Sequence, residues 1–215
     1  MTDPIKIIVG LGNPGPSNLL DRHNAGYWFA DVLARRYGGE FRSEVKFHGD
    51  LCRVNIEGHD IRLLKPTTYM NRSGLAIQAL AAYLKYTASQ ILVVHDELDL
   101  PLGKVKLKRG GGHGGHNGLR DVISHIGKEF FRLRIGIGHP GDKEEVIDYV
   151  LRRASREDEN IIIDTINDAA GVIPLLLAEG EHKAMHKLHS RDVIPKPYRK
   201  DAEEDGEEDK GEEGK

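Results

Sequence analysis

The sequence has almost no cysteine and no long hydrophobic run. Cys52 is the only cysteine among 215 residues, so the chain can form no internal disulfide and no cysteine-based zinc site. No run approaches the roughly 18 apolar residues that a membrane-spanning helix needs. The N-terminus passes directly into a strand-like pattern, without the charged and then apolar segments of a signal sequence. We therefore expect a soluble, cytoplasmic protein that does not associate with a membrane.

Charge is distributed unevenly along the chain. Residues 201–215 hold nine acidic and two basic residues, a net charge of −7, whereas the whole chain carries −3. Residues 1–200 therefore carry +4, which is a weak indication of a polyanionic partner. Residues 194–215 have few apolar side chains and much charge of one sign, which predicts a disordered tail. We expect one domain over residues 1–193, followed by an acidic tail over 194–215.

Strand-like and helical patterns alternate along the predicted domain. The predicted strands cover residues 5–9, 46–56, 60–64, 91–94, 104–108 and 133–137. The predicted helices cover about 18–37, 73–83, 117–126, 143–152 and 156–177. This alternation predicts an α/β fold, a single-domain three-layer sandwich. Its twisted, mixed and mostly parallel sheet should carry helices on both faces, and ligands should bind beyond the carboxyl ends of the strands.

Five polar or glycine-rich motifs lie where predicted strands end. They cover residues 10–15, 22–26, 66–71, 95–101 and 109–118. The fold would bring together one histidine, one aspartate and three asparagines from these motifs: His23, Asp96, Asn13, Asn71 and Asn117. Such a set can activate a water molecule and hold a carbonyl group. It contains no nucleophilic serine or cysteine.

His23 is the candidate general base. A single histidine in a first helical turn is more often structural, and we expect one of His23 and Asn24 to face solvent. However, Asp96 ends a buried strand at the same sheet edge. A carboxylate beside one imidazole nitrogen fixes the tautomer and leaves the other nitrogen as a base. With water as the nucleophile, this pair is sufficient for hydrolysis.

Asn71 and Asn117 each offer hydrogen-bond donors and acceptors in one uncharged amide. These groups could position a water molecule, bind a peptide carbonyl or stabilise an oxyanion. Asparagines beside glycine more often belong to turns and caps. Asn117 could simply cap its predicted helix.

The glycine-rich motifs fit nucleotide sites poorly. Residues 10–15 match the dinucleotide pattern, but Pro14 has no N–H to offer a phosphate, and no acidic strand end follows at the required spacing. A rigid turn that directs Asn13 toward the cleft is the better interpretation. Residues 109–118 lack the phosphate-loop spacing and predict a flexible flap or a close approach to a ligand.

Histidines elsewhere indicate no metal site. His113 and His116 have no apparent third ligand in the sequence. His182, His186 and His189 have helical spacing, and we expect them on a solvated face.

A row of lysines leaves two interpretations open. Lys104, Lys106 and Lys108 share one strand face. They could keep an edge strand soluble, or they could form a phosphate-binding stripe that Arg134 and Lys143 extend.

Six segments together resemble bacterial-type peptidyl-tRNA hydrolase, over about residues 5–189. They are Ile8–Gly15, Arg22–Gly26, Pro66–Asn71, His95–Pro101, Gly110–Gly118 and Arg132–Gly141. The resemblance implies a monomeric α/β enzyme that cleaves the ester between a peptide and the 3′-terminal ribose of tRNA. Such cleavage recycles tRNA from stalled translation, and it needs no cofactor.

The resemblance also implies residue roles. His23 would be the catalytic base and Asp96 would orient it. The substrate cleft would include Asn13, Met70, Asn71, Asn117 and, on the flap, His116. The residues expected to hold tRNA phosphate are Lys108, Arg134 and Lys143.

The chain departs from the family pattern in three places. Asn18 replaces the usual tyrosine, which would help shape the cleft wall, and Asp21 replaces a threonine. Asp21 could cap the helix and could raise the basicity of His23. The acidic tail is also outside the pattern, and we expect it to occupy the basic surface loosely and weaken RNA binding.

Two other functions compete with this interpretation. A non-catalytic RNA-binding member of the same fold, such as a splicing factor, would not need the His23–Asp96 pair. A nucleotide-dependent oxidoreductase would need the glycine pattern without Pro14.

Overall fold

The structure, a computed structural model, describes residues 4–190. The predicted acidic tail lies outside the described residues. Within them, one seven-stranded sheet has the order β2-β3-β4-β1-β5-β7-β6. The strands are β1 Ile7–Gly10, β2 Arg42–Glu44, β3 Gly49–Ile56, β4 His59–Pro66, β5 Ile91–Glu97, β6 Val105–Arg109 and β7 Phe131–Gly136. The central strands β4, β1, β5 and β7 are parallel, and β2, β3 and β6 join antiparallel at the flanks.

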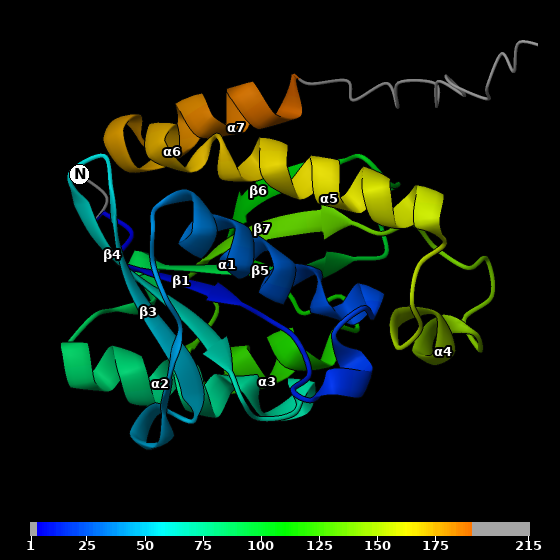
Figure 1. The fold of residues 1–215 in the computed structure, drawn as a ribbon, viewed down its shortest axis with the longest axis horizontal. Coiled ribbons are helices and arrows are strands. Elements are labelled where there is room, and N and C mark those ends of the chain that lie inside the picture. The colour runs from blue at the N-terminus through cyan, green and yellow to red at the C-terminus, as the bar shows by residue number, and fades with distance from the viewer. Residues whose placement is uncertain (1–3, 191–215) are drawn as a thin grey trace, which may run out of the picture.

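Helices cover both faces of this sheet (Figure 1). The helices are α1 Ala25–Arg36, α2 Ser73–Leu84, α3 Asn117–Ile126, α4 Val146–Val150, α5 Arg156–Ala170, α6 Ile173–Glu179 and α7 Glu181–His189. In Figure 1, α2 and α3 lie below the sheet, and α5, α6 and α7 lie above it. α1 crosses in front of the central strands in this view and shares a hydrophobic core with α5. The predicted three-layer α/β sandwich is confirmed.

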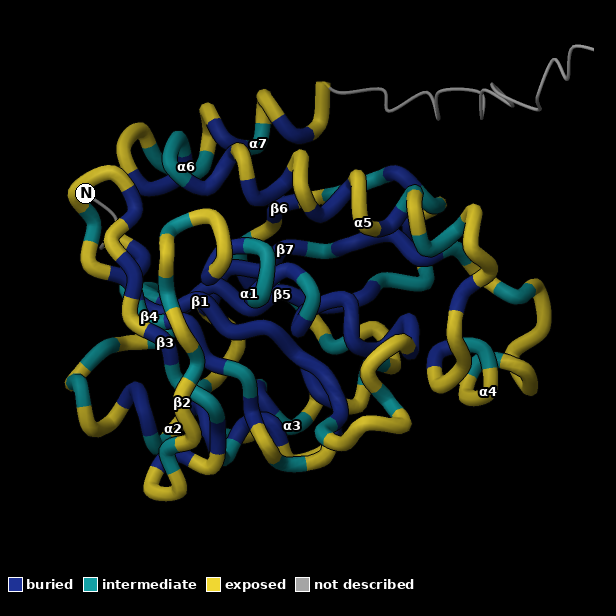
Figure 2. Tube along the Cα trace, in the orientation of Figure 1, coloured by how far each residue is buried: buried dark blue, intermediate teal, exposed yellow. Residues whose placement is uncertain are grey.

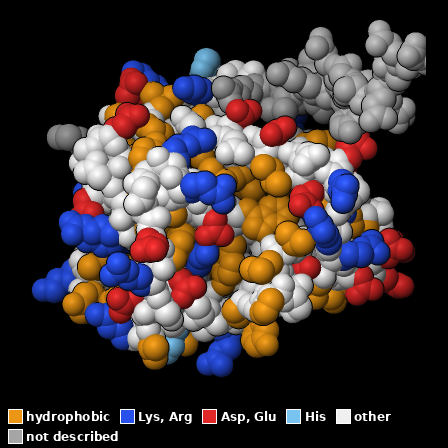
Figure 3. Space-filling view, viewed as in Figure 1, with side chains coloured by type: hydrophobic (Ala, Val, Ile, Leu, Met, Phe, Trp, Pro, Cys, Tyr) orange, Lys and Arg blue, Asp and Glu red, His pale blue; other side chains and the backbone are white. Residues whose placement is uncertain are grey.

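The sheet separates two hydrophobic cores. Alternate residues of β1 point to opposite faces, so Ile8 belongs to the core beneath α1 and α5, and Ile7 and Val9 belong to the core beneath α2 and α3. All three side chains are fully buried. The buried trace therefore runs through the centre of the molecule in Figure 2. Charged side chains of both signs are interspersed on the face that Figure 3 shows.

The predicted helix over residues 18–37 begins later than its pattern suggests. Two short 3₁₀ turns, Pro16–Asn18 and Arg22–Asn24, precede α1. The side chain of Asn24 accepts a hydrogen bond from the Asn13 N–H at 2.8 Å and donates one to its carbonyl at 3.0 Å. These bonds tie the second turn to the loop after β1. Helical periodicity alone could not predict these hydrogen bonds between Asn13 and Asn24.

The predicted helix over residues 156–177 is two helices. α5 ends at Ala170, and α6 starts after a two-residue break, with a proline in its first turn. By length and composition alone, the segment Arg156–Glu179 could cross a membrane, which corrects the expectation that no segment approaches such a span. Half of the most apolar 18-residue stretch of this segment is buried. Its side chains, including Ile162 and Ile166, pack in the core, so its hydrophobicity is that of core helices.

Gly26 sets the distance between α1 and the sheet. The Tyr27 N–H donates to the Leu11 carbonyl at 3.1 Å, and the Leu11 N–H donates to the Val94 carbonyl at 2.9 Å. A Cβ atom on Gly26 would overlap the backbone of both Leu11 and Val94. The absence of a side chain therefore lets the start of α1 approach the ends of β1 and β5.

We expect Gly26→Ala to destabilise the protein by about 1–3 kcal/mol or more, because backbone atoms must move to admit the methyl group. Urea denaturation gives the free energy of unfolding. Gly112→Ala is the matched control, since a Cβ there meets open space. Equal unfolding midpoints for the two variants would show that the approach of α1 to the sheet is not tight.

Candidate active site

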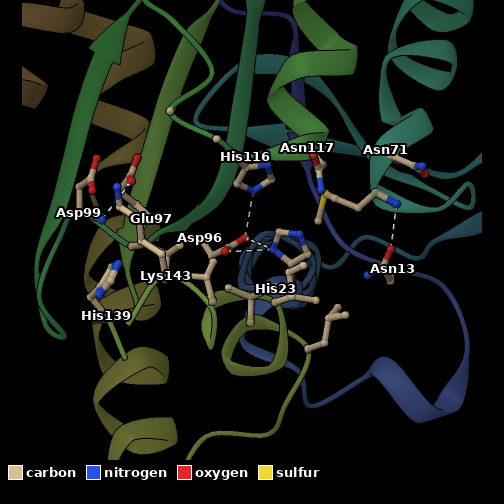
Figure 4. A pocket seen from close by; sticks show the side chains of 18 of the residues that line it. Asn13, His23, Asn71, Asp96, Glu97, Asp99, His116, Asn117, His139 and Lys143 are labelled. Carbon is tan, nitrogen blue, oxygen red and sulfur yellow. Dashed lines mark hydrogen bonds and ion pairs between the residues drawn. The ribbon is translucent and has the colours of Figure 1, made fainter. Parts of the chain in front are cut away.

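The structure brings His23 and Asp96 into direct contact. His23 lies in the turn before α1, and Asp96 lies near the carboxyl end of β5. The Nδ1 atom of His23 is 2.9 Å from Oδ1 and 3.0 Å from Oδ2 of Asp96 (Figure 4). Since a carboxylate accepts hydrogen bonds, Nδ1 carries the proton and Nε2 keeps a free lone pair. Both His23 and its neighbour Asn24 are buried, so the expectation that one faces solvent is wrong.

His116 contacts the same carboxylate, and its ring centroid lies 4.8 Å from that of His23. Its Nε2 atom is 3.1 Å from Asp96 Oδ1. Its Nδ1 atom accepts hydrogen bonds from the N–H groups of Gly118 and Leu119, at 3.1 and 3.3 Å. His116 is thus the N-cap of α3, and the predicted alternative that Asn117 caps this helix is wrong. Because Nδ1 must be unprotonated to accept, Nε2 carries a proton and donates it to Asp96.

This arrangement does not fit a metal ion. One atom from each of His23, Asp96 and His116 could in principle act as a ligand, and all these atoms lie within 4.8 Å of one another. A metal at Nε2 of His116 would require the ring proton on Nδ1. Two backbone N–H groups already point at Nδ1. The group is therefore a hydrogen-bonded network, with two N–H donors converging on one carboxylate.

The interactions in this network lower the pKa of Asp96 and raise the pKa of His23. Burial raises the pKa of the Asp96 carboxyl, but the charges and hydrogen bonds of His23 and His116 outweigh burial and bring the pKa well below its ordinary value. Burial lowers the pKa of His23, but Asp96 and, to a smaller extent, Asp21 raise the pKa above its ordinary value. His23 is therefore a stronger base than an isolated imidazole.

His95 supports this network and was not identified from the sequence. Its ring is fully buried and packs edge-on against His116, with ring centroids 5.0 Å apart. Its Nδ1–H donates to the Asp96 carbonyl at 2.6 Å. Burial, helped by the nearby His116, lowers the pKa of His95 to about 3, so the ring is neutral. The available signal was an imidazole that directly continues a buried apolar strand.

A network of amides forms the neighbouring wall. The Oδ1 atom of Asn13 accepts the Met70 N–H at 2.8 Å, so Asn13 links the loop after β1 to the turn before α2. Asn24 holds Asn13 in place through its backbone. Sequence patterns did not assign Asn24 a role in the site. The Oδ1 atom of Asn117 accepts from Arg120 at 2.9 Å, which leaves its NH₂ group as the donor.

A cavity of about 780 Å³ contains this chemistry. In Figure 4, Asn13 and Asn71 lie on one side of His23, and Glu97 and Lys143 lie on the other. Met70, His116 and Asn117 also line the cavity. Every predicted catalytic and substrate-binding residue therefore meets in one place. The cavity also has an apolar wall that sequence patterns did not reveal, formed by Val146, Ile147, Val150 and Leu151.

Residues 7–196 match the peptidyl-tRNA hydrolase family. The chain belongs to this family. A peptidyl-tRNA hydrolase from Halorhodospira halophila is 54% identical over 86% of this chain and 96% of the relative. One from Alkalilimnicola ehrlichii is 50% identical over 89% of this chain and all of the relative. The crystal structure of peptidyl-tRNA hydrolase from Acinetobacter baumannii, 49% identical, covers 86% of this chain and 95% of its own, with a TM-score of 0.83.

The three basic residues that the family resemblance assigns to tRNA phosphate differ in their surroundings. Lys108 is exposed on β6, and Lys143 is exposed at the cavity. Arg134 instead pairs with Glu97, with Nε and Oε2 2.8 Å apart. Its charge is therefore partly neutralised. β6 is an edge strand, as the protective interpretation of its lysines requires.

One of the three C-terminal histidines is not simply solvated. His182 and His186 are exposed, as expected. The Nε2 atom of His189, however, accepts the N–H of Leu107 on the edge strand β6 at 3.2 Å. A helical spacing of polar residues could not identify a bond to a strand 82 residues away in the chain.

Asn18 and Asp21, which differ from the family pattern, each make defined contacts in the structure. The Asn18 side chain donates to the Pro14 carbonyl at 2.7 Å and so closes its own turn. Asp21 is buried and makes no side-chain cap to the following turn, so the predicted capping role is wrong. Its backbone instead pairs with Arg153. Its charge does act on His23 in the predicted direction.

We expect Asp21→Asn to shift the acidic limb of the pH–activity profile to lower pH. Removal of the carboxylate removes one contribution that raises the pKa of His23, so His23 stays unprotonated at lower pH. The measurement is kcat/KM for hydrolysis of N-acetyl-aminoacyl-tRNA across pH 5–9. Asp164→Asn, on the exposed face of α5, is the control. A limb that stays in place or moves to higher pH would contradict the role of Asp21.

Proposed function

We propose that this protein hydrolyses the ester between a peptide and the 3′-terminal ribose of tRNA. The observation that carries the proposal is the contact of His23 with Asp96 at 2.9 Å inside a cavity large enough for a peptide end. Membership of the peptidyl-tRNA hydrolase family supports the same substrate. The protein would act as a cytoplasmic monomer, without a cofactor or a membrane, and would return tRNA to translation.

The reaction starts from neutral His23. Its Nε2 atom takes a proton from a water molecule held by Asn117, and the water oxygen attacks the ester carbonyl carbon. Asp96 stabilises the imidazolium that forms, because its own carboxylate stays charged throughout. The proton then passes from His23 to the ribose oxygen as the carbon–oxygen bond breaks. The products are a peptide with a free carboxylate and a tRNA with a free hydroxyl group.

The amides stabilise the substrate and the oxyanion. Asn13 uses its oxygen to hold the Met70 N–H, so its NH₂ group remains to donate toward the substrate. Asn71 lies on the same side of the cavity (Figure 4). Amide NH₂ groups in a partly buried site can donate hydrogen bonds to the negative charge that develops on the oxyanion, and they remain uncharged themselves. Met70 and His116 complete the substrate contacts.

Two exposed lysines would hold tRNA phosphate. Lys108 and Lys143 can approach a backbone freely, whereas Arg134 already pairs with Glu97. An RNA-binding protein without catalysis is the competing function. It would have no need of a buried histidine whose pKa is raised by a carboxylate.

We expect His23→Ala to lower the rate at least about 100-fold, because the general base is removed. The assay follows release of N-acetyl-amino acid from N-acetyl-aminoacyl-tRNA, with unblocked aminoacyl-tRNA as substrate control. His186→Ala, on the exposed face of α7, is the matched variant. Tight tRNA binding without cleavage by the wild type would support the RNA-binding alternative instead.

We expect Lys108→Ala and Lys143→Ala each to reduce the salt dependence of tRNA binding. The slope of log K against log salt concentration should become shallower by about 0.7–0.9 for each phosphate that is no longer neutralised. Arg134→Ala should change the slope less, because Glu97 already pairs with the guanidinium. Lys187→Ala on α7 is the control. Unchanged slopes for both lysine variants would favour the protective role of the β6 lysines.

A further inference from the structure

The apolar wall of the cavity belongs to a small helix that lies apart from the sheet. α4, Val146–Val150, has five residues and lies beyond the N-terminal end of α5 in Figure 1. Val150 is buried, but Ile147 is 67% exposed although it lines the cavity. Val150 and Tyr149 fix one side of α4 to the core, and the Tyr149 hydroxyl donates to the Ile137 carbonyl at 2.6 Å. Within the described part of the chain, the exposed side of the wall, with Ile147, has no such support from the core.

Arg22 connects the C-terminal end of α4 and the loop after it to the turn that carries His23. One terminal nitrogen, Nη1, lies 3.2, 3.1 and 3.2 Å from the carbonyl oxygens of Tyr149, Arg152 and Arg153, respectively. The guanidinium carbon lies 4.1 Å from the centroid of the Tyr149 ring, and Nη2 lies 3.6 Å from Asp158 on α5. One side chain thus joins the end of α4, the following loop and the start of α5.

These contacts require an arginine. Its flat guanidinium can stack on Tyr149 while the same group donates to carbonyls in its plane, which a lysine ammonium cannot do. The side chain is buried, and its Nε atom has no partner among the described residues. An unpaired buried donor is unfavourable, so the remaining contacts must compensate for it.

Arg22 is also the residue immediately before His23. The Arg22 N–H donates to the Arg152 carbonyl at 3.4 Å, and the neighbouring Asp21 pairs with Arg153 as an isolated β-bridge. The turn that contains His23 is therefore bonded directly to the segment that follows the apolar wall. We propose that Arg22 is a positioning residue that fixes the α4 wall relative to His23, and so sets how tightly the acyl part of the substrate is held. This inference rests on the proposed function.

The test compares Arg22→Lys with Arg36→Lys. Arg36 also donates to a backbone carbonyl, that of Asn167 at 3.1 Å, but on the exposed side of α1. We expect Arg22→Lys to raise KM for N-acetyl-leucyl-tRNA about tenfold, since misplaced binding groups weaken productive binding. The pH dependence of kcat should not change, because the His23–Asp96 contact is intact. Arg36→Lys should change neither quantity.

Hydrogen exchange tests the same contact without using activity. We expect faster exchange of the amides in residues 146–153 of Arg22→Lys than in the wild type or Arg36→Lys. Unchanged exchange would overturn the proposal even if the wild type cleaves the substrate. Failure of the wild type to cleave, with exchange altered as expected, would overturn the proposed function but would still show that Arg22 holds α4.

A second variant changes the wall itself and can be measured whether or not Arg22→Lys folds. Ile147→Ser changes an exposed wall side chain and should leave folding intact. Ile147→Ser should raise KM without any change at Arg22. Where Arg22→Lys folds, the effects of the two substitutions on KM should be less than additive in the double variant, because both act through one wall. An unchanged KM for Ile147→Ser, or a drop in kcat alone for Arg22→Lys, would overturn the proposal.

Discussion

The site depends on one buried carboxylate. Asp96 accepts hydrogen bonds from His23 and His116, and without these two donors a charge at that depth would be strongly unfavourable. Each histidine is in turn oriented by a different part of the fold. His23 is held by the turn that packs at the end of β1, and His116 is held by the first N–H groups of α3. The carboxylate thus joins both faces of the sheet at one point.

Much of this organisation could be predicted from the sequence. Buried strands appear as apolar runs, and the carboxyl ends of parallel strands meet at one sheet edge, so Asp96 and the motif containing His23 could be placed together. The start of α1 could not be located, because it depends on the side-chain bonds between Asn13 and Asn24. The family resemblance supplied the contribution of His116, but not its role as a helix cap.

The errors share a physical cause. Local patterns describe what a segment can do alone, whereas Asn24, His95 and Arg22 act through partners in other segments of the chain. Arg22 contacts residues about 130 positions away, and nothing near it in the sequence indicates this. Arg134 was predicted from its charge, but its pairing with Glu97 follows from register between β5 and β7.

The bond from Leu107 to His189 has a consequence for how copies of this protein meet one another. β6 is an outer strand, and an open N–H on such a strand can pair with a strand of another molecule and begin aggregation. The imidazole of His189 occupies the Leu107 N–H from the last turn of α7. α7 therefore covers part of the open edge of β6, and Lys106 and Lys108 are exposed on either side of Leu107. The five residues of β6 therefore carry two features that oppose pairing with a strand of another copy: exposed lysines and an N–H group that is already bonded.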